Sequence, residues 1–168
     1  GLLNILIRFE AFFTAVNYLS YTLKGKPYMG IGRNMAYKKS LFFKSKGFAA
    51  HMHVASGEDD LFVNANATSV NTAIVIHKDT HVWSEPKTSF IAYLRQKKRH
   101  LGARKLYQKS HRFMLKIQTI VPILFYGLGI SLLCFNSTLY LALGIFGLNM
   151  IIRCLIYPRL LKRLNYSE

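Results

Sequence analysis

The C-terminal third of this 168-residue chain contains two apolar runs, "IQTIVPILFYGLGISLLCF" at residues 117–135 and "LYLALGIFGLNMII" at residues 139–152. The first run holds nineteen residues without a charge, and the second also reaches nineteen, at Tyr157, if the side chain of Arg153 extends toward the surface. About 20 apolar residues cross the core of a bilayer. Because only "NST" (136–138) separates the two runs, they predict a tight transmembrane hairpin.

The alternative, two buried helices of a soluble core, fits this stretch less well. Both runs are apolar all round rather than along one stripe, whereas a helix at the edge of a soluble core keeps one polar face. Four glycines, Gly127, Gly129, Gly144 and Gly147, also suit close helix packing in lipid, but would weaken a soluble helix by about 1 kcal/mol each.

Basic residues flank the hairpin on both sides. Nine Lys or Arg lie between Arg95 and Lys116, and Arg159, Lys162 and Arg163 follow the second run. Lys and Arg accumulate in the cytoplasmic segments next to membrane helices. Both ends of the hairpin, and everything before residue 117, are therefore expected in the cytosol.

The whole chain is strongly basic, with a formal net charge of +16 and only seven acidic residues. Such a charge could face nucleic acid, anionic lipid or a phosphorylated small molecule. The neighbouring hairpin makes lipid the better counter-charge, and no recognised nucleic-acid motif is present, so we expect no nucleic-acid partner. Cys134 and Cys154 have no partner at zinc-site spacing, and the sequence predicts no metal ligands.

Upstream of the hairpin the pattern alternates between helical and extended segments. Residues 2–23 form an aromatic-rich amphipathic pattern, which suits either a core helix or a helix at the lipid interface. The other predicted elements are a short strand at 34–39, helices at 40–48 and 59–68, a buried strand at 71–77 and a long basic helical stretch at 87–115 that is interrupted near Gly102.

Three acidic residues stand together in "SGEDDLF" (56–62): Glu58, Asp59 and Asp60, here called the acidic triplet. Acidic residues at a helix start often complement the helix dipole, with Ser56 as a possible N-cap. Adjacent carboxylates also repel one another, so one can have a raised pKa, as a general base requires. The triplet alone leaves both interpretations open.

The order of motifs favours the second interpretation. "GIGRNMAYKK" (30–39) precedes the acidic triplet, and "QKKRH" (96–100) follows it before the hairpin. This order resembles the C-terminal half of a membrane-anchored family 2 glycosyltransferase. The stretches "PYMGIGRNMAYKKSLFF", "GEDDLFVN" and "SEPKTSFIAYLRQKKRH" are similar to a bacterial subgroup of Bacteroidetes type, and the resemblance covers residues 2–107.

The resemblance implies an α/β fold: the C-terminal half of a GT-A domain followed by the two-helix hairpin. The cytosolic part would span residues 1–116, without its nucleotide-binding half. The hairpin would span residues 117–157 and a basic tail residues 158–168. The protein would then be a multi-pass protein of the bacterial inner membrane, with its catalytic part in the cytosol.

The resemblance also implies an inverting transfer of sugar from a nucleotide-diphosphate donor to a lipid-linked or polysaccharide acceptor. Asp59 would be the base, with Glu58 and Asp60 as orienting or reserve carboxylates. Gln96 and Arg99 match the family's Q-x-x-R element, which contacts the donor pyrophosphate and the acceptor, and His100 stands where the family usually has Trp. Gly32, Arg33 and Asn34 would contact donor or acceptor.

The family's early Asp and D-x-D motif are not found in this sequence. The expected divalent metal, Mg or Mn, would therefore have its ligands outside this chain, which opens without an initiator Met and would be incomplete and inactive alone. The alternative function is a non-enzymatic membrane-anchored basic module that binds anionic lipid or a partner protein.

Overall fold

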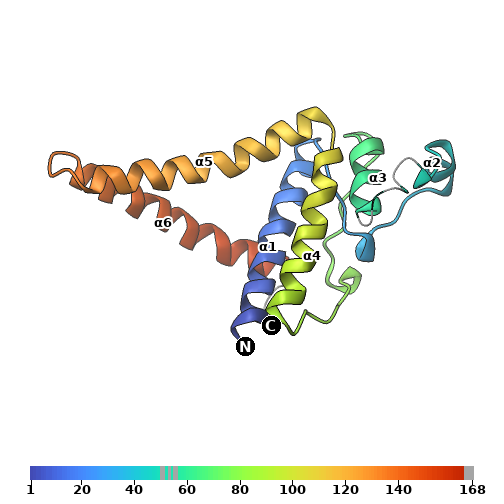
Figure 1. Cartoon of the computed structure of the whole chain (residues 1–168), viewed down its shortest axis with the longest axis horizontal. Coiled ribbons are helices and arrows are strands. Elements are labelled where there is room, and N and C mark those ends of the chain that lie inside the picture. Colours follow the sequence, from blue (N-terminus) through green and yellow to red (C-terminus); the bar gives the residue numbers. More distant parts are fainter. Residues whose placement is uncertain (50–51, 53, 55–56, 165–168) are drawn as a thin grey trace. The chain divides into compact units, whose positions relative to one another are not determined.

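The structure is a computed structural model that describes residues 1–49, 52, 54 and 57–164. Its elements are helices and short 3-10 turns, and the described residues contain no β-strand (Figure 1). The predicted α/β fold is therefore wrong for this chain. Residues 71–77 alternate between half-buried and exposed positions, as an extended chain does, but an extended segment becomes a strand only where a neighbour completes its hydrogen bonds.

The chain divides into two units, Gly1–Lys109 and Ser110–Glu168. The first holds α1 (Leu2–Leu23), η1 (Gly32–Asn34), α2 (Lys39–Lys44), α3 (Glu58–Asn66), η3 (Lys78–Thr80), α4 (Phe90–Ala103) and η4 (Arg104–Leu106). α5 (Lys109–Leu133) and α6 (Leu139–Arg163) form the second. The predicted strand at 34–39 is instead η1, an extended link and the start of α2. The predicted interruption of the basic helix lies just beyond Gly102, at η4.

The core of the first unit is small. Its most buried apolar side chains come from α1, α3, α4 and the segments beside them: Phe12, Tyr28, Leu61, Phe62, Tyr93, Ala103 and Tyr107. On one side, α1 meets α4 through Glu10, which accepts a hydrogen bond of 2.6 Å from the Tyr93 hydroxyl and pairs with Lys97. On the other side, α3 packs against the C-terminal end of α4.

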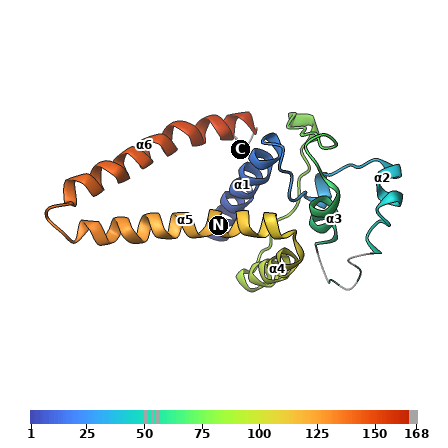
Figure 2. The same ribbon diagram turned by 90° about the horizontal axis from the view of Figure 1, so that it is seen from above.

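In the second unit, α5 and α6 form an antiparallel hairpin (Figure 2). Near the turn, Phe146 of α6 meets Phe125 of α5 edge to face, with ring centroids 5.6 Å apart. A Cβ on Gly129 would lie 2.3 Å from the Phe146 ring, so this glycine permits the close approach of the two helices. The packing explains one of the four glycines that suggested a membrane hairpin.

In the part of the chain that the structure describes, three helices are long and apolar enough to cross a membrane: α1 with 22 residues, and α5 and α6 with 25 each. Their apolar windows are at most 6% buried inside the protein, which leaves almost all of that surface for another apolar environment. The membrane prediction is confirmed in this general form. The sequence predicted two spans, whereas α1 is a third candidate.

Gly57 makes the contact that places α3 on α4. Its φ is +96°, a left-handed conformation, and a Cβ there would lie 2.4 Å from the Cβ of Ala103. A side chain at position 57 would be strained in its backbone and would also push the two helices apart. This contact determines where the acidic triplet, which follows immediately, lies relative to α4.

We predict that Gly57→Ala destabilises the first unit by about 2–4 kcal/mol, the combined cost of a left-handed alanine and an overpacked contact. Gly102→Ala is the matched control, because Gly102 lies in α4 with open space around its Cβ position. That change should stabilise the protein by about 0.5–1 kcal/mol. Thermal unfolding of the purified chain in detergent measures both, and equal stability of the two variants would contradict the role of Gly57.

Candidate functional site

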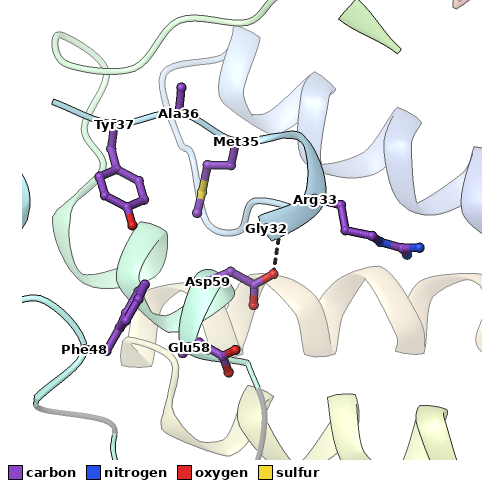
Figure 3. Close-up of a pocket in the computed structure, with 8 residues that line it drawn as sticks. All are labelled: Gly32, Arg33, Met35, Ala36, Tyr37, Phe48, Glu58 and Asp59. Atoms are coloured by element: carbon purple, nitrogen blue, oxygen red, sulfur yellow. Dashed lines mark hydrogen bonds between the residues drawn. The ribbon is translucent and has the colours of Figure 1, made fainter. Parts of the chain in front are cut away.

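A pocket of about 570 Å³ opens between η1, the link that follows it and the start of α3 (Figure 3). The residues that line it are Gly32, Arg33, Met35, Ala36, Tyr37, Phe48, Glu58 and Asp59. Two of the three predicted motifs, which lie some 25 residues apart in sequence, therefore meet at one cavity. Two of the predicted catalytic carboxylates, Glu58 and Asp59, both line this pocket.

Asp59 is held in one orientation. Its Oδ2 accepts a hydrogen bond of 2.7 Å from the backbone N–H of Gly32, and its Oδ1 accepts one of 2.9 Å from the N–H of Asp60. A Cβ at position 32 would lie 2.7 Å from Asp59 Oδ2, so only glycine allows the backbone to come this close. Each carboxylate oxygen has lone pairs left over, which can accept a proton or a hydroxyl group from a ligand.

The three site residues predicted in the motif at 30–39, here called the glycine loop, are Gly32, Arg33 and Asn34. Arg33 and Asn34 lie at the edge of the site. Arg33 lines the pocket, but its guanidinium donates a hydrogen bond to the Ser84 hydroxyl and points away from Asp59 in Figure 3. Asn34 is exposed, and its backbone N–H closes the 3-10 turn on Ile31 at 2.8 Å. Of the three predicted loop residues, Gly32 therefore has the direct link to the acidic triplet.

An aromatic wall completes the pocket, and the sequence reasoning missed it. Tyr37 stacks on Phe42 with centroids 5.4 Å apart and lies 4.8 Å from the Phe62 ring. Phe48 packs edge to face on Phe42 at 5.2 Å. The signal available in the sequence was the aromatic spacing of "AYKKSLFFKSKGF" (36–48), whose residues come together only when α2 folds back toward α3.

Asp60 lies outside the pocket. Asp60 is 7% exposed, and Tyr28, Tyr107 and Arg104 are all within electrostatic range of its carboxyl group. Burial and the adjacent Asp59 charge raise the pKa of Asp60 to about 7. The buried Tyr107 hydroxyl is close enough to lower that pKa in part, yet it makes no hydrogen bond of good geometry. The carboxyl with the raised pKa is thus not the one in the pocket.

A polar network behind Asp60 fixes the segment that follows α4. The Asn64 amide donates to the carbonyl of Tyr28 at 2.7 Å, and Asn64 Oδ1 accepts from the N–H of Gln108 at 2.8 Å. The Gln108 side chain donates to the Asn64 carbonyl at 2.6 Å. Asn64 is 2% exposed, so these bonds satisfy a polar group that would be costly to bury alone. They hold Tyr107 against Asp60.

The third motif, at 96–100, has one residue, His100, whose pKa is affected by the charge of the acidic triplet. Partial burial and the nearby charges of Lys97 and Arg99 lower the pKa of His100, while the Asp59 charge acts in the opposite direction. His100 is therefore within electrostatic range of Asp59. Gln96 is half-buried and Arg99 is exposed on α4, and among the described residues neither makes a hydrogen bond to the acidic triplet.

Two expectations for the site have no structural counterpart to examine. The N-cap assigned to Ser56 lies outside the described residues. The Mg or Mn ion stays a prediction, because its ligands were expected outside this chain. Within the described ranges no group of three His, Cys, Asp or Glu side chains could hold a metal ion.

Comparisons of the chain with family models, with curated proteins and with solved structures found no match. The resemblance to family 2 glycosyltransferases therefore stays a prediction from the motifs.

The raised pKa of Asp60 predicts a pH-dependent stability. The carboxyl titrates near 3.8 when free and near 7 in the folded chain, so between these values the folded state binds more protons than the unfolded state. The free energy of unfolding should therefore fall as pH rises from about 4 to about 7, by up to about 1.4 kcal/mol per pH unit from this group.

Asp60→Asn should remove that component and give a flatter profile of melting temperature between about pH 5 and about pH 8. Glu85→Gln, at an exposed acid, serves as the control and should keep the profile of the unchanged chain. Parallel profiles for Asp60→Asn and the unchanged chain would show that Asp60 is ionised in the fold throughout this range.

Proposed function

We propose that this chain is the acceptor-activating, membrane-anchored part of an inverting glycosyltransferase that uses a nucleotide-diphosphate sugar. The observation that carries the proposal is the hydrogen bond from Gly32 to Asp59 at the pocket between the glycine loop and the acidic triplet. It joins two motifs that were associated only by their order in the sequence. The Asp59 charge also acts on the pKa of His100, which belongs to the third motif.

In the proposed reaction, Asp59 takes the proton of an acceptor hydroxyl that enters the pocket. The hydroxyl oxygen then attacks the anomeric carbon of the donor sugar from the face opposite the diphosphate. The bond between that carbon and the diphosphate oxygen breaks, and its electron pair leaves with the nucleoside diphosphate. The backbone N–H groups that hold Asp59 orient the base before the substrate arrives.

The surrounding residues supply binding. Tyr37 and Phe48 offer apolar ring faces to a sugar in the pocket, the role that the family usually gives to the Trp replaced here by His100. Arg99 with Gln96, one turn apart on α4, would stabilise the charge of the departing diphosphate. The donor half of the site and its Mg or Mn ion would come from residues outside this chain.

The membrane placement follows from the same proposal. A lipid-linked or polysaccharide acceptor would be extended at the cytosolic face of the bacterial inner membrane, where the basic flanks of the α5–α6 hairpin are attracted to anionic headgroups. The second unit would then anchor the site at the surface where such an acceptor is found.

One observation favours a second function. The outward face of α4 mixes cations with exposed apolar side chains: Arg95, Lys98 and Arg99 lie among Ile91 and Leu94, which are 62% and 49% exposed. This pattern suits a helix on an anionic lipid surface. It fits the non-enzymatic membrane module, but it does not account for the orientation of Asp59 in a pocket.

The test is transfer of labelled sugar to the membrane fraction by the natural polypeptide that contains this chain. Asp59→Asn should lower the transfer rate by roughly 100-fold to 10,000-fold, the contribution of a positioned general base, while leaving donor binding and membrane insertion intact. Asp79→Asn is the control, because Asp79 is an exposed acid distant in sequence from the pocket motifs, and its rate should stay unchanged.

Near-normal transfer by Asp59→Asn would overturn the base assignment. Near-normal transfer by Asp59→Asn and Glu58→Gln together would overturn the site. Full cellular function of that double variant, combined with loss of vesicle binding when Arg95, Lys98 and Arg99 are neutralised, would instead establish the lipid-binding module.

A further inference from the structure

Arg153 is a charged residue inside an apolar helix. It is the only charged residue of α6 before Arg159, and apolar stretches flank it on both sides. A charge within a membrane-spanning helix costs about 2.5–3.5 kcal/mol at the helix centre on insertion scales. A cation retained at such a place therefore needs polar partners or a function.

Side chains of its own helix hold the Arg153 guanidinium. Its Nε donates a hydrogen bond of 2.8 Å to Asn149 Oδ1, and its Nη1 donates one of 3.0 Å to the Tyr157 hydroxyl. Asn149 lies one turn before Arg153 and Tyr157 one turn after it, so both are on the same helix face. Asn149 and Tyr157 thus hold the guanidinium from two sides along the helix.

The facing helix takes part as well. The central carbon of the guanidinium lies 6.0 Å from the centre of the Tyr126 ring of α5 and 5.9 Å from that of Tyr157. Figures 1 and 2 show that α5 and α6 are joined at the turn and separate away from it. The aromatic rings place the cation on the inner side of the hairpin, where cation–π attraction compensates part of the lost hydration.

All of these partners are neutral. The sequence has no acidic residue between Glu85 and Glu168, so the hairpin offers Arg153 no counter-charge of its own. A guanidinium has five N–H donors, and the hydrogen bonds to Asn149 and Tyr157 use two of them. The remaining donors, with a full positive charge, are suited to an anion that presents two oxygens side by side.

The position of Arg153 along the helix indicates where that anion comes from. Arg153 lies four residues before Tyr157, where the apolar run ends, and six residues, or about 9 Å of helix rise, before Arg159. It is therefore in the half of α6 that ends in basic residues. An arginine side chain can cover such a distance by extending toward the headgroups. The anion within reach there is the phosphate of a lipid.

We propose that Arg153, oriented by Asn149 and Tyr157 and flanked by Tyr126, binds the phosphate group of a membrane lipid at the inner side of the α5–α6 hairpin. The phosphate could belong to a polyprenyl phosphate or to a glycerophospholipid, which present the same oxygens. The site goes beyond the proposed sugar transfer and does not depend on it.

The experiment measures lipid binding by the full chain in neutral detergent, through the shift in melting temperature and the lipid adducts seen by native mass spectrometry. The probes are a short polyprenyl phosphate and phosphatidylglycerol. Polyprenol and diacylglycerol, which lack the phosphate, are their matched controls. We expect the phosphate lipids to bind, and Arg153→Met to weaken their binding by roughly tenfold or more, as loss of a charge-assisted fork implies.

Arg159→Met is the matched variant. It removes a cation of the same helix whose side chain donates to the backbone carbonyl of Leu155 at 2.7 Å. It should weaken binding less than Arg153→Met does, because it removes general attraction to anionic headgroups but no guanidinium oriented by polar partners. Asn149→Ala keeps the charge but removes the acceptor that orients it, so it should weaken binding even if Arg153→Met does not fold.

Binding of polyprenyl phosphate but not of phosphatidylglycerol would support the proposal with the polyprenyl lipid as the ligand, and binding of both would support it with bilayer lipid included. Equal binding of polyprenol and its phosphate, or equal loss in Arg153→Met and Arg159→Met, would overturn it. None of these readouts requires sugar transfer, so failure here and failure of the proposed reaction are separate results.

Discussion

The first unit depends on the close contact between Gly57 and Ala103. Because a glycine at φ +96° leaves no side chain between the two helices, the first turn of α3 can lie directly against the last turn of α4. That contact sets the position of the next three residues, which are the acidic triplet. It also buries Tyr107 beneath α3, where Asn64 and Gln108 complete the packing with hydrogen bonds.

From this starting point, the geometry of a helix separates three adjacent acids into three environments. Successive residues of an α-helix are rotated by about 100°. Glu58 is exposed at the pocket, Asp59 turns toward the glycine loop, and Asp60 turns inward to the buried tyrosines. Three side chains of the same chemistry therefore differ in hydration and partners. Burial keeps Asp60 largely protonated below about pH 7, which reduces the repulsion that three charges in a row would cause.

The chain has a net charge of +16 and only seven acidic residues, and two of these acids make contacts between distant segments of the first unit. Glu10 accepts a hydrogen bond from the hydroxyl of Tyr93 and forms an ion pair with the ammonium of Lys97, and so connects α1 to α4. Asp59 accepts a hydrogen bond from the backbone N–H of Gly32 in the glycine loop. Arg153 is the opposite case, a cation among neutral partners. Glu10 and Asp59 thus connect segments of the first unit that are distant in sequence.

The sequence by itself determined two of the three candidate membrane helices in the described part of the chain, because uncharged apolar runs of nineteen and fourteen residues need an apolar environment whatever the rest of the chain does. It also predicted helices near α3 and α4, at 59–68 and within 87–115, because the preference for a helix is largely local. It failed for the strands at 34–39 and 71–77, because a strand exists only through hydrogen bonds to a neighbour that its own residues do not specify. Only the tertiary structure decided that Asp59, and not Asp60, faces the pocket with Gly32. It alone also placed Tyr37 and Phe48 in the wall of that pocket. In the second unit, it brought Arg153 next to Tyr126. Each of these depends on contacts between segments distant in sequence, whose geometry no local pattern contains.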